Sequence, residues 1–529
     1  MTEKDTNPPI ITPPHIDPSP ILPDNEEFAA YHQRRVHLFT LLTCVLAFLS
    51  AIAYLVVGSG SLIMPFVLLI ILAILIVLWH YPSATFYLLF TATLLFETAV
   101  SNKPDAIVEK VPFFLNINTM VQTYAHADFK ALPINIPEVL LFITACMAGI
   151  HAAFNRHGKI LLGPLCWPIF AYICFVTIGW MNGMATGGDF KISLQEVRPQ
   201  FYFFIAYLMA FNIVRTPRHL LRLYWIMALC IGLKGIIYTI RRNTVFAGMA
   251  LPDQGVGSHE EAFLFDCFIM LLVVMSFCGL HKRLKTAMWF LLPFVVMGNL
   301  ATNRRAGTAA FILVFPILLL AAHRVLPKRR KLISAFSLAV AILGPIYYFT
   351  FRHSESMLAQ PARAIASQFE ANPRDASSNA YRDAENADLM ATIHLAPIQG
   401  YGYGKRMLHV APIADISKEY DWWDIMTHNQ VLWVWMRVGS FGMFSFWMMV
   451  SAIIIQACRN IRDETASTEV KAVSIFGMLV ICMLMFFGLL DLQFSNYRDM
   501  LFGGFCAGMI AIAPQIKAEV STQKKEVLP

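Results

Sequence analysis

The chain contains few charged residues. Of its 529 residues, 14% are Asp, Glu, Lys or Arg, whereas an average soluble domain has about 25%. Since 57% of the residues are hydrophobic, this composition excludes an ordinary soluble enzyme and a disordered chain. The net charge of +7 does not indicate binding to nucleic acid, because the basic residues lie in short clusters between long apolar runs. The pattern is typical of a polytopic membrane protein.

The sequence also lacks a disulfide framework and any metal-ligand spacing. It has ten cysteines, but they lie within or at the end of apolar runs and none lies in a long loop. We interpret them as small packing residues. We therefore expect neither a bound metal nor a cofactor.

Long apolar runs predict the fold. About 20 mainly apolar residues are needed to cross a bilayer, and about fourteen runs approach this length. They predict an all-α, polytopic membrane bundle of about 12–14 transmembrane helices, with a large extracytoplasmic loop that contains short helices. The runs are 36–57, 61–79, 83–100, 137–154, 161–180, 201–214, 219–240, 261–280, 283–301, 306–323, 332–351, 430–456, 470–490 and 497–514.

The remaining segments define the predicted domain organisation. Residues 1–35 are polar and rich in proline, which predicts a disordered tail, with a docking segment as the alternative. Residues 36–514 form the predicted membrane domain, in which residues 352–429 form the large loop. Residues 515–529 form a second, short tail.

The basic residues of the short loops predict the orientation. When the predicted helices are counted in order, these clusters all fall on one side, which the positive-inside rule assigns to the cytoplasm. Both tails are then cytoplasmic, and the large loop lies on the opposite, periplasmic side. The clusters lie at 34–35, 156–159, 215–218, 282–285, 324–331 and 459–471.

Arginines on the other side are exceptions to this rule. Arg304 and Arg305 occupy a tight turn between two apolar runs, and Arg198 precedes the sixth predicted helix. Arg241 and Arg242 end the seventh. A guanidinium binds phosphate through two parallel, charge-assisted hydrogen bonds. These arginines therefore predict phosphate binding, with contact to lipid headgroups as the alternative, above all for Arg241 and Arg242.

Two ionisable residues lie within predicted spans. Lys234 and Asp266 are at similar depth on consecutive helices, so we expect them to form an ion pair that supports the site, with a direct catalytic role as the alternative. His259 precedes two glutamates at the start of a helix and is a further candidate for the site.

His428 is the candidate for proton transfer. It closes the large loop and, with Asn429, opens the helix predicted at 430–456. Histidine suits proton transfer near neutral pH. A helix-capping or membrane-interface role is the alternative.

Together these motifs resemble the O-antigen ligase and O-antigen or exopolysaccharide polymerase superfamily of bacterial inner membranes. A large late loop ends in His428-Asn429, and Gly439 follows eleven positions after the histidine. An earlier short turn carries Arg305-Ala306-Gly307, and an arginine, Arg198, precedes an apolar helix. The glycine-rich segment 400–405 is also similar to one that such proteins carry before the histidine.

The resemblance covers roughly residues 137–514 and has two departures. The turn has Arg304 and Arg305 where one arginine is expected, which leaves the choice between them open. About fourteen helices are predicted, against about twelve in the ligases.

The resemblance implies an enzyme that takes a glycan from an undecaprenyl-diphosphate carrier and joins it to an acceptor hydroxyl. His428 is then the base. The residues that support this base are Lys234, His259, Asp266 and Asn429. The fixed guanidiniums take the place of a metal ion, because they stabilise the leaving diphosphate. The implied partners are the lipid-linked glycan, membrane lipid, a chain-length regulator (polysaccharide co-polymerase) and a flippase. The implied diphosphate ligands are Arg198, Arg242, Arg304 and Arg305.

Several functions remain open at this point. Polymerisation of exopolysaccharide or O-antigen repeat units is the first, and ligation of a glycan to lipid A core or to a protein is the second. A lipid-linked oligosaccharide flippase or other transporter is the third, but the chain shows no similarity between its halves. A peptidoglycan glycosyltransferase, for which Asp491 is the candidate carboxylate, ranks last.

Overall fold

The chain divides into two compact units, Met1–His80 and Tyr81–Pro529, and the second contains almost all of the residues that the structure describes. The predicted tail at 1–35 and the helices predicted at 36–57 and 61–79 lie almost wholly outside the described residues. The computed structural model describes residues 33, 36–37, 40–41, 82–97, 113–114, 116, 134–154, 160–247, 255–258, 260–370, 373–412, 415, 417 and 422–526.

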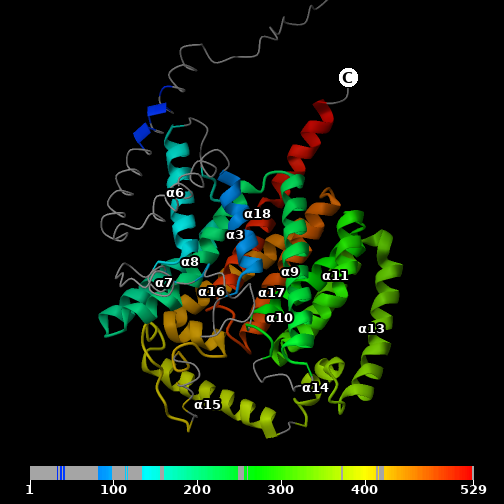
Figure 1. Cartoon of the computed structure of the whole chain (residues 1–529). Coiled ribbons are helices and arrows are strands. Elements are labelled where there is room, and N and C mark those ends of the chain that lie inside the picture. The colour runs from blue at the N-terminus through cyan, green and yellow to red at the C-terminus, as the bar shows by residue number, and fades with distance from the viewer. Residues whose placement is uncertain are drawn as a thin grey trace, which may run out of the picture. The chain divides into compact units, whose positions relative to one another are not determined.

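The described part of the second unit is helical, and no strand occurs among its residues (Figure 1). Nine of its helices are long and apolar enough to cross a membrane, and α3 and α6 contain shorter apolar stretches. The predicted polytopic all-α membrane bundle is confirmed. The helices are α3 (Pro82–Leu95), α6 (Ile136–Phe154), α7 (Cys166–Ala185), α8 (Phe190–Ile213), α9 (Pro217–Thr244), α10 (Glu261–Cys278), α11 (Lys282–Ala301), α12 (Arg305–Val325), η1 (Pro327–Arg329), α13 (Arg330–Phe351), η2 (Met357–Ala359), α14 (Gln360–Ala366), α15 (Pro373–Leu395), α16 (Gln430–Arg462), α17 (Thr468–Gly488) and α18 (Tyr497–Glu526).

One helix start was predicted wrongly. The apolar run begins at residue 201, whereas α8 begins at Phe190. Asp189 caps the helix by accepting a hydrogen bond from the Ile192 amide at 2.8 Å. The first turns are polar, so hydropathy alone missed them. Arg198 consequently lies inside α8 rather than before it.

The core of the bundle is formed by α10, α17 and α18, which are buried over most of their length (Figure 1). In contrast, Ile333 is the one buried residue of α13. The apolar side chains of α13 are mostly exposed, for example Leu343 and Phe349. Such a surface suits contact with lipid tails, which are as apolar as leucine.

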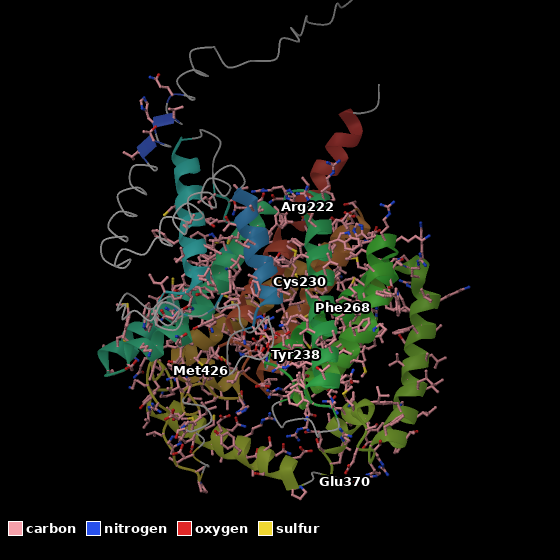
Figure 2. The ribbon with its side chains drawn as sticks, viewed as in Figure 1. Arg222, Cys230, Tyr238, Phe268, Glu370 and Met426 are labelled. Carbon is pink, nitrogen blue, oxygen red and sulfur yellow. The ribbon has the colours of Figure 1, made fainter. Side chains whose placement is uncertain are left out.

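Basic last turns of two helices lie at the same end of the bundle. Figure 2 shows Arg222 near one end of α9, while Glu370 and Met426 lie toward the other end of the bundle. The basic last turns of α12 and α16 lie at the Arg222 end, since both helices begin at the opposite end. We call that opposite end, from which residues 352–429 emerge, the loop end. Which of the two ends faces the cytoplasm stays a prediction.

The large loop contains the expected short helices η2 and α14, and also the longer helix α15. Figure 1 shows α15 lying across the loop end of the bundle, on the side of α16. Its sequence alternates alanine with polar residues and is too polar to be a membrane span.

A glycine breaks α16 eleven residues after His428. Gly439 has φ 70° and ψ −176°, so the helix is interrupted there. Residues 397–401, which lead into the glycine-rich segment, fill the break. The Tyr401 amide donates to the Met436 carbonyl at 2.7 Å, and the Ser440 amide donates to the Pro397 carbonyl at 2.9 Å. A Cβ on Gly439 would overlap the carbonyl oxygen of Ile398.

We predict that Gly439→Ala destabilises the protein. The variant combines an unfavourable φ with a backbone clash, and we expect a loss of about 2 kcal/mol or more. The measurement is thermal unfolding in detergent. Gly344→Ala is the matched control, because Gly344 lies in α13 with no atom near its Cβ position, and there alanine should be neutral or stabilising. Equal melting temperatures for the two variants would contradict the assignment.

Candidate functional site

A cavity of about 580 Å³ lies at the loop end of the bundle. Its walls are the start of α12, the helices α14 and α15, the start of α16, and the residues that follow α17. Membrane helices and loop helices therefore meet around one space. Its polar side chains are Arg305, Thr308, Gln368, Asn379, Arg382, Asp383, Asn386, His428 and Asn429.

Other residues that line the cavity are apolar. Ala309, Ile312 and Leu313 of α12 line it, and Ile312 and Leu313 are also exposed on the outside of the bundle. Phe369 at the rim is exposed as well. The cavity thus has both polar lining residues and exposed apolar ones, which suits an amphipathic ligand with its tail in the membrane.

His428 is held by a carboxylate that the sequence did not single out. The His428 backbone amide donates to Glu385 Oε2 at 2.9 Å, and its Nδ1 lies 3.2 Å from the same carboxylate. Glu385 is 1% exposed, whereas the His428 side chain is 28% exposed and lines the cavity. As a carboxylate, Glu385 accepts a hydrogen bond from Nδ1–H, so Nε2 carries the lone pair that can accept a proton.

Tyr381 completes the surroundings of this pair. Its ring packs edge-on against the His428 imidazole, with 5.9 Å between the centroids. Burial, followed by the negative charge of Glu385, raises the pKa of Tyr381 above its usual value, so the hydroxyl stays protonated.

The two adjacent arginines have different environments. Arg305 opens α12, lines the cavity, and reaches Asp375 Oδ1 at 3.2 Å and Ser367 Oγ at 3.3 Å. Arg304 precedes it and is half-buried. Burial lowers the pKa of Arg304, the carboxylates of Asp491 and Glu260 oppose this shift, and the charge of Arg382 adds to it.

The other predicted phosphate ligands lie elsewhere. Arg198 is buried in α8, where its Nε lies 2.6 Å from Glu138 Oε1, and it does not line the cavity. Arg242, in the last turn of α9, hydrogen-bonds to the Phe246 carbonyl and does not line it either. The structure therefore brings Arg305 together with His428 and Asn429, but not Arg198 or Arg242. His259 lies outside the described residues.

The predicted pair of Lys234 and Asp266 is wrong. Lys234 forms ion pairs with Glu97, at 3.2 Å, and with Glu261, while Asp266 accepts a hydrogen bond from Asn299 at 2.8 Å. Equal depth does not fix the direction around a helix. Five residues of α-helix turn about 140° beyond a full turn, so Glu261 and Asp266 point to different faces of α10.

Glu261 belongs to a larger buried cluster. Arg498 of α18 pairs with both Glu260 and Glu261, and its guanidinium also donates to the carbonyls of Thr93 and Leu94. The cluster links α3, α9, α10 and α18 in the core. Because each buried charge has an opposite partner, the burial cost is partly offset.

A second buried pair holds the glycine-rich segment. Arg437 of α16 lies 2.6 Å from Glu196 of α8, and both side chains are fully buried. Arg437 also donates to the carbonyls of Gly402, Lys405 and Ile425 at 2.9, 2.8 and 3.1 Å. Arg437 is a charged residue in an otherwise apolar run, and this was the feature of the sequence that indicated the contact.

Arg382 and Glu385 are the site residues that sequence reasoning missed. Their signal was spacing: residues 382, 385 and 386 fall on one helical face within an alanine-rich polar segment. Hydropathy does not detect such a helix, and its contacts depend on how the loop folds back.

We predict energetic coupling between Lys234 and Glu261 and none between Lys234 and Asp266. In double-mutant cycles, Lys234→Met with Glu261→Gln should show an interaction energy of about 1 kcal/mol or more. Lys234→Met with Asp266→Asn, the matched control on the same helix, should be additive. Thermal or denaturant unfolding in detergent measures both. Coupling to Asp266 alone would restore the rejected pair.

Comparison with known protein families identifies part of the chain. Residues 287–447 match the Wzy_C family, described as O-antigen ligase. The match begins within α11 and ends within α16, so it includes Arg305, α14, α15 and His428. A comparison with curated proteins gives no match. Residues 287–447 of this polytopic membrane protein are therefore similar to the O-antigen ligase family, in agreement with the resemblance of the motifs around Arg305 and His428.

Proposed function

We propose that the protein transfers a glycan from an undecaprenyl-diphosphate carrier to the hydroxyl of an acceptor. The observation that carries this proposal is the meeting of three features in one cavity. These are the His428–Glu385 pair, Arg305, and an opening onto the apolar face of α12. The O-antigen ligase family domain supports glycosyl transfer with a lipid-linked glycan.

The donor fits the cavity by its chemistry. Its polyprenyl tail lies against Ile312 and Leu313 of α12, on the outside of the bundle. Its diphosphate meets the guanidinium of Arg305 at the start of the same helix. The helix N-terminus adds partial positive charge at this point. The glycan then extends toward α15 and the loop.

The reaction transfers one proton and one glycosyl group. The acceptor oxygen forms a bond to the anomeric carbon of the donor sugar while the bond from that carbon to the phosphate oxygen breaks. The electron pair of the broken bond leaves with the diphosphate, whose growing charge Arg305 stabilises. His428 Nε2 takes the hydroxyl proton, and Glu385 stabilises the imidazolium that forms.

The acceptor determines which member of this class the protein is. We propose polymerisation of lipid-linked repeat units on the periplasmic face of the bacterial inner membrane, in which the acceptor is a second lipid-linked glycan. Ligation to lipid A core or to a protein uses the same donor chemistry and differs only in the acceptor. The experiment below separates the two.

Purified protein in detergent, given an undecaprenyl-diphosphate oligosaccharide as the sole substrate, should produce a ladder of longer glycans. His428→Ala should slow the reaction by about 100-fold or more, because the base is lost. Arg305→Ala should slow it as well. His409→Ala is the matched control, since His409 pairs with Asp388 of α15 but does not line the cavity.

Other outcomes of this assay would identify a different function or a different base. A donor that reacts only after lipid A core or an acceptor protein is added would identify a ligase. Full activity of His428→Ala at equal protein level would remove the assignment of the base. No glycosidic product with any acceptor would favour a transporter.

Glu385 is a positioning residue in this mechanism, and Glu385→Gln tests it. The amide keeps the size of the side chain but not its charge, so we expect kcat to fall about tenfold to a hundredfold, with the KM for the donor unchanged. Glu385→Asp should recover part of the loss. A rise in KM with unchanged kcat would instead assign Glu385 to substrate binding.

A further inference from the structure

Helix α15 turns one face toward the cavity. Asn379, Arg382 and Asn386 line it and follow one another at helical spacing. Asp375, one turn before Asn379, lies on the same stripe and pairs with Arg305 of α12 at 3.2 Å. The loop helix therefore forms the wall of the cavity that faces the membrane helix.

Arg382 is the cation of this wall. Its Nε is buried and has no hydrogen-bond partner among the described residues. Within that part of the chain, no carboxylate forms an ion pair with it. Asp383 also lines the cavity, but it is exposed to solvent. A guanidinium with a buried, unsatisfied donor at a cavity wall is costly unless a ligand completes it.

The neighbouring arginines are compensated differently. Arg305 has Asp375, and Arg304 lies near Asp491 and Glu260. Arg382 lies close enough to Arg304 for the two positive charges to repel each other. An anion between the two helices removes this repulsion and accepts charge-assisted hydrogen bonds from both sides.

We propose that Arg382 binds the diphosphate of the donor from the α15 side of the cavity, opposite Arg305, and that this contact fixes α15 in place. The inference rests on the proposed function, which supplies the diphosphate. Arg382 adds a phosphate-binding side chain from the loop. The bound donor therefore bridges the loop and the membrane helices.

The contact has a consequence for the base. Glu385 lies three residues after Arg382, on the same helix, and orients His428. When the diphosphate fixes Arg382, it also fixes the carboxylate that sets the direction of the imidazole. A bound donor then stabilises the orientation that Glu385 gives the imidazole, which couples donor binding to proton transfer.

The test uses the full-length protein in detergent, with undecaprenyl diphosphate that carries no glycan as the probe. Its binding should protect residues 373–395 from hydrogen exchange in the wild type. Arg382→Ala should weaken binding by about tenfold to a hundredfold, which corresponds to the loss of one or two charge-assisted hydrogen bonds, and should remove this protection. Arg382→Lys should lose less, because it keeps the charge.

Arg352→Ala is the matched control. Arg352 is another arginine of the loop, but it lies over the Phe349 ring rather than in the cavity. Its replacement by alanine removes the same charge as Arg382→Ala. Exchange of α15 without the lipid should be equal in all variants. If Arg382→Ala changes the exchange of α15 without the lipid but leaves the affinity for the lipid unchanged, Arg382 has only a structural role and the inference is overturned.

Two further results separate this inference from the proposed function. If Arg305→Ala weakens binding and Arg382→Ala does not, the carrier binds without α15 and only the further inference fails. If the wild type does not distinguish undecaprenyl diphosphate from undecaprenol, no diphosphate site exists, and the proposed function fails with it.

Discussion

The buried ion pair between Arg437 and Glu196 is the constraint on which the loop end depends. Arg437 contacts the carbonyls of the glycine-rich segment and of Ile425, three residues before His428. Glu196 also accepts a hydrogen bond from the Gly404 amide at 2.6 Å. One guanidinium thus ties together α8, α16 and two segments of the returning loop, at Gly402–Lys405 and at Ile425. Because a buried charge without these partners costs several kcal/mol, the loop has one favoured way to return to the bundle.

Two weaker contacts then dock α15 over the cavity. Arg305 holds its first turn through Asp375, and His428 meets its middle through Glu385. The membrane helices supply an apolar opening and a cation, whereas the loop supplies a carboxylate and a second cation. Neither part forms the proposed site without the other. This division explains why the large loop contains a helix that is too polar to cross a membrane.

The sequence predicted the helices well because a bilayer imposes a length and a polarity on each span. It failed where those constraints do not apply. The polar first turns of α8 and the whole of α15 carry no hydropathy signal. The pairing of Lys234 with Asp266 was wrong for a related reason: depth along a helix follows from counting residues, whereas direction around it depends on how the helices pack.

The sequence by itself determined the apolar spans and the position of His428 and Arg305 at helix starts, His428 at the end of the long loop and Arg305 after a tight turn. These features are local, because they follow from residue type and spacing. Only the tertiary structure decided which charges meet. Glu385 lies 43 residues from His428, and Glu196 lies far from Arg437 along the chain, so their contacts exist only once α15 and α8 have packed. The ionic partners of a buried charge are long-range choices, which residue spacing along one helix does not encode.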